Sequence, residues 1–172
     1  MKNEKQDVLT FVLFIVYMLL LIGVILFKLP FRPAGIGYEM RTINLMPFQG
    51  SLRTEISLNV LIFAPLGIYL CMLKNEWTLV KKALFTIGLS FSFEAFQFIF
   101  AIGRADITDI ISNTLGGIIG LGIYAVLFKI FKNRTARIIN MLALAVTICV
   151  VLRFGHLFYL SHFVMGRGGQ LG

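Results

Sequence analysis

The stretch VLTFVLFIVYMLLLIGVILF, residues 8–27, decides the fold class, because it contains 20 residues and no charge. A membrane-spanning helix needs about 20 predominantly apolar residues. The apolar segment of a signal peptide is shorter, about 7–15 residues, and a small-residue cleavage site follows it. Here Lys28, Leu29 and Pro30 follow instead. We therefore interpret residues 8–28 as a retained membrane helix.

The composition of the whole chain supports this class. Of the 172 residues, 58% are hydrophobic and 14% are charged, whereas soluble domains have roughly 45–50% and about 25%. These values exclude a disordered chain, a collagen and a coiled coil. The net charge of +8 points to anionic lipid headgroups rather than to nucleic acid. We expect Cys71 and Cys149, which lie in apolar runs, to be buried thiols without a metal.

Four more apolar runs follow the first one. None shows the strict alternation of a barrel strand, so we predict helices. The expected fold is an all-α integral membrane protein in one domain, residues 1–172. It is a bundle of about five transmembrane helices with a longer first extracytoplasmic loop. The expected helices are residues 8–28, 56–73, 83–103, 109–129 and 138–160.

The basic residues predict an orientation, because cytoplasmic loops carry an excess of Lys and Arg. With the N-terminus inside and the C-terminus outside, nine basic residues face the cytoplasm and six face outward. The inner set is Lys2, Lys5, Lys74, Lys81, Lys82, Lys129, Lys132, Arg134 and Arg137; the outer set is Lys28, Arg32, Arg41, Arg53, Arg104 and Arg167. We expect a multipass membrane protein with a cytoplasmic N-terminus and an extracytoplasmic C-terminus.

Polar residues within the expected helices gather in one half of the membrane, the outer half in this orientation. The buried carboxylate of Glu94 is the most costly of them unless it is paired, hydrated or protonated. Gln97 lies one turn away on the same helix face. Together with Arg104, Asp109 and Asn113, these residues could line one polar cavity.

Each of these residues also has a purely structural interpretation. Asp106 and Asp109 could cap a helix N-terminus, and Asn59 could form interhelical hydrogen bonds. Glu94 could pair internally with Arg153. Glycines spaced as in Gly116-x-x-x-Gly120 most simply form a close helix-packing face.

Five motifs in residues 41–122 resemble the VanZ-like family. They occur in order and at sensible spacing. The motifs are RTINLMPF (41–48), NVLIFAPLG (59–67), FEAFQ (93–97), RADITD (104–109) and NTLGG (113–117).

The resemblance implies a multipass bacterial membrane protein and, for the closest members, reduced susceptibility to teicoplanin-type lipoglycopeptides. It supplies no established reaction. The positions that carry over by motif are Arg41, Asn44, Pro47, Phe48, Asn59, Pro65, Gly67, Glu94, Gln97, Arg104, Asp106, Asp109, Asn113 and Gly117.

Two classes of function remain open. The first is binding or modification of a membrane lipid or lipid-linked cell-wall precursor at the outer leaflet, since Arg makes forked contacts with phosphate. The expected binding residues are Arg41, Asn44, Asn59, Gln97, Arg104, Asp106 and Asn113.

The second class is a hydrolase or transferase acting on a polyprenyl-phosphate or phospholipid. Glu94 would then be a general acid or base, with Asp109 as a second catalytic residue. A small lipid transporter is a further alternative. We expect no cofactor and no metal, and an oligomer is possible.

Overall fold

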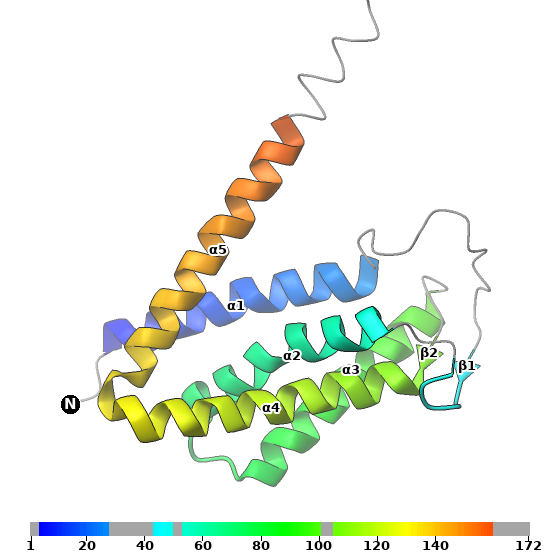
Figure 1. Ribbon diagram of the computed structural model, residues 1–172, viewed down its shortest axis with the longest axis horizontal. Helices are drawn as coiled ribbons and strands as arrows, with labels where there is room; N and C mark the ends of the chain where they lie inside the picture. The colour runs from blue at the N-terminus through cyan, green and yellow to red at the C-terminus, as the bar shows by residue number, and fades with distance from the viewer. Residues whose placement is uncertain (1–3, 28–42, 50–52, 101–104, 160–172) are drawn as a thin grey trace, which may run out of the picture.

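A computed structural model of the chain describes residues 4–27, 43–49, 53–100 and 105–159. This part is almost entirely helical, with five α-helices, one short 3₁₀ helix and two strands of two residues each (Figure 1). The helices are α1 (Glu4–Phe27), α2 (Arg53–Leu73), α3 (Leu79–Ile99), α4 (Ile107–Phe131), η1 (Lys132–Arg134) and α5 (Thr135–Tyr159). The strands are β1 (Ile43–Asn44) and β2 (Ala105–Asp106).

The helices lie where the apolar runs predicted them, but the start of α3 differs. Thr78 is its N-cap, and the Thr78 side chain accepts a hydrogen bond from the Lys81 backbone N at 3.3 Å. The expected connection through Lys82 is therefore wrong, because Lys82 lies inside α3. Its side chain is only 5% exposed, and Nζ lies 3.9 Å from the Cys71 sulfur.

Three stretches of the described chain are long and apolar enough to cross a membrane. They are Glu4–Ile25, Arg53–Leu73 and Ile107–His156, the last of which contains α4, η1 and α5. Helix α3, which carries Lys81, Lys82 and Glu94, is not among them. The crossing of a membrane by five separate helices thus stays a prediction.

Helices α2 and α4 lie side by side, and glycine permits their close approach. A Cβ atom built on Gly120 would overlap the carbonyl oxygen of Ala64, and one built on Gly116 would overlap that of Val60. Gly67 of α2 faces the Gly117 backbone in the same way. Small residues allow helix backbones to come together in membranes, so this seam fixes α4 against α2.

Beside this seam, α2 packs against α1 and α3 through an apolar cluster. Phe63 and Leu66 of α2 are fully buried, and Leu21 of α1 and Phe93 of α3 pack in the same cluster. The Tyr17 hydroxyl of α1 donates to the backbone of α2 at 2.8 Å. Helices α1, α2 and α3 therefore share one apolar core, and the glycine seam joins α4 to it.

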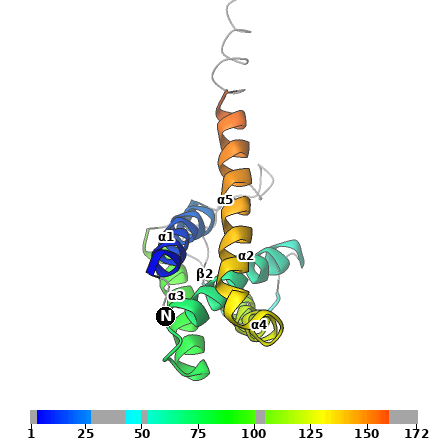
Figure 2. The same cartoon turned by 90° about the vertical axis from the view of Figure 1, so that its left-hand side faces the viewer.

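Helix α5 leaves this bundle. Figure 1 shows α5 pointing away from the other four helices, and Figure 2 shows the same separation after a turn of the molecule. The chain changes direction at Lys132, whose φ of 47° is unusual for a residue other than glycine. Near its start, α5 is tied to α1 by a hydrogen bond from Asn140 Nδ2 to Thr10 Oγ1 at 2.8 Å.

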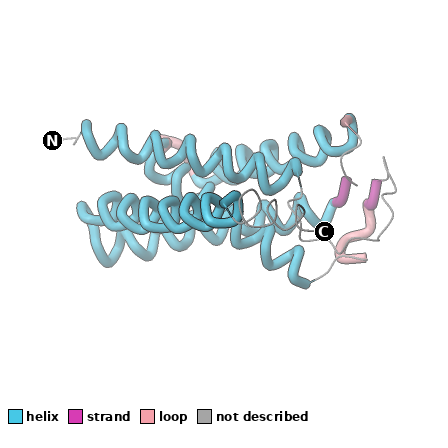
Figure 3. The backbone as a smooth tube through the Cα atoms, turned by 90° about the horizontal axis from the view of Figure 1, so that it is seen from above, coloured by secondary structure: helices cyan, strands magenta, loops and turns pink. Residues whose placement is uncertain are grey.

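Strands β1 and β2 were not predicted from the sequence. They pair in parallel, with Ile43 opposite Ala105 and Asn44 opposite Asp106. Figure 3 shows both strands at one end of the group of helices. The pair connects the end of the first loop to the start of α4, where most of the expected site residues lie.

Candidate functional site

The carboxylates of Asp106 and Glu94 organise the start of α4. Asp106 is the N-cap of this helix, and its Oδ1 accepts from the Thr108 backbone N at 2.9 Å. The Asp106 backbone N donates to Glu94 Oε2 at 2.8 Å. Capping by Asp satisfies an orphan helix donor and complements the helix dipole. Glu94 of α3 thus binds the backbone of the residue that caps α4.

A turn from the first loop is fixed on this pair. Asn44 Nδ2 donates to Asp106 Oδ2 at 3.0 Å, and Asn44 Oδ1 accepts from the Met46 backbone N at 3.1 Å. The Phe48 backbone N donates to Thr108 Oγ1 at 2.9 Å. Phe48 has a φ of 65°, so the chain turns sharply here. The motif residue Asn44 therefore orders the loop rather than projecting freely.

A second set of polar groups joins α2 to α4. Asn59 Nδ2 donates to Asp109 Oδ1 at 2.8 Å and lies 3.2 Å from Ser112 Oγ. The structural interpretation of Asn59 as an interhelical bond is thereby confirmed. Asp109 faces α2 in this contact, one turn beyond the Asp106 cap.

Two amides extend the polar interior further. Asn113 is 2% exposed, and its Nδ2 donates to Ser90 Oγ at 2.9 Å. Gln97 is 1% exposed, and its Nε2 donates to the carbonyl oxygen of Ile25 in α1 at 2.8 Å. Asn113 Oδ1 and Gln97 Oε1 are buried without a hydrogen-bond partner among the described residues. Buried acceptors without a hydrogen-bond partner are rare in native proteins.

The structure therefore brings Asn44, Glu94 and Asp106 together at the start of α4. Asn59 and Asp109 form a neighbouring pair between α2 and α4, while Gln97 and Asn113 bond to α1 and α3. We call these seven residues the polar cluster. Arg41 and Arg104, which were also expected in the site, lie outside the described residues.

Sequence reasoning missed Thr108 and Ser90, both fully buried hydroxyl partners of the polar cluster. Ser90 stands one turn before Glu94 on α3, and that spacing was a usable signal. Thr108 lies inside the RADITD motif between Asp106 and Asp109, and its uncharged side chain gives no signal of its own. Among the described residues, no group of three or more His, Cys, Asp or Glu side chains could hold a metal ion.

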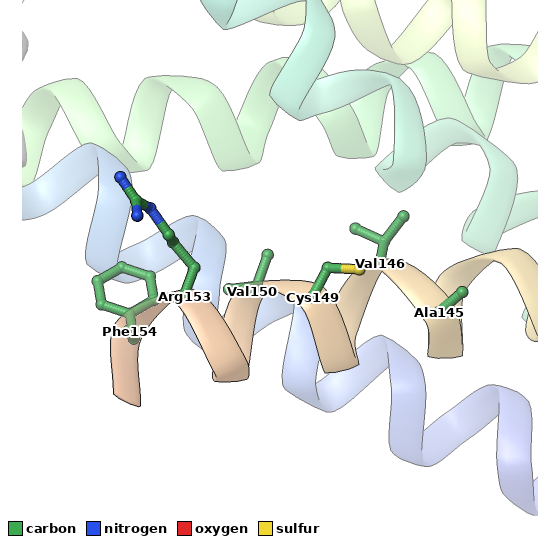
Figure 4. A pocket seen from close by; sticks show the side chains of 6 residues that line it. All are labelled: Ala145, Val146, Cys149, Val150, Arg153 and Phe154. Carbon is green, nitrogen blue, oxygen red and sulfur yellow. The ribbon is translucent and has the colours of Figure 1, made fainter. Parts of the chain in front are cut away.

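The alternative pairing of Glu94 with Arg153 is wrong. Glu94 is 4% exposed inside the bundle, whereas Arg153 is exposed on the diverging helix α5. Figure 4 shows Arg153 beside Phe154 in an apolar hollow on α5. The expected burial of Cys149 is also wrong, because this thiol is exposed in the same hollow.

Comparison with known proteins agrees with these motifs. The VanZ/LLP1 family profile matches residues 14–132, a range that contains the polar cluster and helices α2 to α4. The chain belongs to the VanZ/LLP1 family. It is 37% identical over 145 residues to the protein named VanZ of Enterococcus faecium, covering 82% of this chain and 89% of that protein. No solved structure matches the chain.

The matched range can be placed on the helices of this chain. It begins within α1 and ends at Lys132, where α4 gives way to η1. More than half of α1 and all of helices α2 to α4 fall inside it. Helix α5 follows it, and the hollow with Arg153 is a feature outside the matched residues.

Proposed function

We propose that this chain lowers susceptibility to teicoplanin-type lipoglycopeptides by binding the phosphate of a membrane lipid or lipid-linked cell-wall precursor at the outer leaflet. The membership of the VanZ/LLP1 family and the 37% identity to VanZ support the resistance role. The proposal would place the chain where such antibiotics meet their cell-wall targets.

The single observation that carries the binding role is the parallel pairing of β1 with β2. It fixes Ile43 opposite Ala105. Arg104 directly precedes Ala105 in the sequence, and Arg41 stands two positions before Ile43. In the sequence, each arginine therefore stands just before one strand of this pair. Two guanidinium groups can share one phosphate through forked contacts.

In this proposal the polar cluster positions the arginines rather than reacting with the lipid. Glu94 accepts from the Asp106 backbone, and Asp106 accepts from Asn44 and Thr108. These bonds connect β1, β2, α3 and α4. Because Glu94 and Asp106 already have structural tasks, we favour binding over proton transfer by Glu94.

The test compares Arg104→Ala with Arg134→Ala, an exposed arginine in η1 at the other end of the bundle. The measurement is the minimal inhibitory concentration of teicoplanin in cells with equal membrane levels of each variant. We expect Arg104→Ala to lose resistance and Arg134→Ala to keep it. Full resistance in Arg104→Ala and in Arg41→Ala would remove the arginines from the mechanism.

A further inference from the structure

One side of α5 forms an apolar hollow with a positive charge at one end. The hollow has a volume of about 390 Å³ and is lined by Ala145, Val146, Cys149, Val150, Arg153 and Phe154. These positions recur every three to four residues and so share one helix face. Figure 4 shows their side chains along α5, with the Arg153 guanidinium near one end of the row.

Arg153 requires a partner that α5 does not supply. Helix α5 contains no Asp or Glu, and no described acidic side chain forms an ion pair with Arg153. A charge within a membrane segment is costly unless it meets an opposite charge or reaches the headgroup region. A lipid phosphate at the membrane surface would supply such an opposite charge.

The walls of the hollow define the rest of the ligand. Valine side chains and Phe154 offer only hydrocarbon contact, which free inorganic phosphate cannot use. An acyl chain can bury apolar surface there while its phosphate accepts forked hydrogen bonds from Arg153. Both features occur together in an anionic phospholipid.

We propose that this face of α5 binds one anionic phospholipid, with an acyl chain along the hollow and the phosphate on Arg153. The site is separate from the polar cluster. It goes beyond the proposed resistance function and does not depend on it.

Cys149 is a native reporter for this site, because it lines the hollow and is exposed, whereas Cys71 is buried. In detergent-purified Cys71→Ala protein, we would measure the rate of Cys149 modification by N-ethylmaleimide. Phosphatidylglycerol should slow this rate at about fivefold lower concentration than phosphatidylcholine with the same acyl chains. Inorganic phosphate should have no effect.

Matched variants separate the charge from the shape. Arg153→Gln should abolish the preference for phosphatidylglycerol, and Arg137→Gln, an exposed position near the start of α5, should keep it. Val150→Trp fills the hollow and should reduce the phosphatidylglycerol that copurifies, measured by mass spectrometry. Val151→Trp, at an exposed position outside the hollow, should not.

Four results would overturn the proposal. Equal protection of Cys149 by the two phospholipids would show that the site does not distinguish headgroup charge. Protection by inorganic phosphate alone would show that binding does not need an acyl chain. A preference that survives in Arg153→Gln would exclude Arg153 as the phosphate contact. Protection of Cys149 that rises with protein concentration without lipid would assign this face to a second copy of the chain.

Discussion

Glu94 is a single buried carboxylate that connects two helices, because its Oε2 accepts from the Asp106 backbone N. Replacing it with alanine leaves that buried donor without this acceptor, which costs about 1–3 kcal/mol. We expect Glu94→Ala to lower the melting temperature, measured by gel filtration after heating in detergent.

Glu94→Gln tests the role of the charge at the same position, because the amide retains an acceptor oxygen. We expect this variant to keep most of its thermal stability and its teicoplanin resistance. Loss of resistance at a normal membrane level and melting temperature would instead support proton transfer by Glu94.

Single residues were partly predictable from the sequence. Glu94, Asn59 and Asp109 stand out because polar groups within apolar helices are costly and few. Their partners were not predictable in this way. Ser90 and Thr108 are small hydroxyl residues of ordinary occurrence, and only the helix arrangement shows that both are buried as partners.

At the scale of helices, the glycine seam predicts a sharp contrast between two positions of α4. Gly120→Leu would drive a side chain into the Ala64 backbone, whereas a Cβ at Gly122 meets nothing within 4 Å. We expect Gly120→Leu to destabilise the bundle by at least about 1–3 kcal/mol and Gly122→Leu to be tolerated. Monodispersity on gel filtration and the melting temperature measure both. Equal stability of the two variants would contradict the seam.

Helix positions followed from the apolar runs, but the direction of α5 did not. Run length predicts where a helix begins and ends. The direction of α5 depends instead on the backbone of Lys132, whose φ is positive, and lysine carries no sequence signal for that conformation. The two short strands could not be predicted either, because two residues are too few to show the alternating apolar and polar pattern of a strand.

For the whole molecule, the distribution of basic residues predicts that the first loop faces outward. In single-cysteine variants, a cysteine at Ser51 should react with an impermeant thiol reagent in intact cells, and one at Asn75 only after permeabilisation. The reverse labelling pattern would show that the protein has the opposite orientation in the membrane.

A cysteine at Gly172 tests whether α5 crosses the membrane. Five crossings place the C-terminus outside, so this cysteine should be labelled in intact cells. If the cysteine at Ser51 is labelled in intact cells, labelling of the one at Gly172 only after permeabilisation would mean that α5 does not cross. The divergence of α5 from the other helices makes this the most informative topology measurement.

The bond between Phe48 and Thr108 has a consequence for biosynthesis, because its two residues are 60 positions apart in the chain. The turn at residues 43–49 leaves the ribosome long before its anchor on α4 has been made. Until α4 is inserted, this turn lacks the contacts with Asp106 and Thr108 that hold it. Nascent chains that end before Asp106 should therefore be cleaved in this turn by added protease, and chains that extend past Phe131 should resist. The last step in shaping the first loop is thus the arrival of the fourth helix.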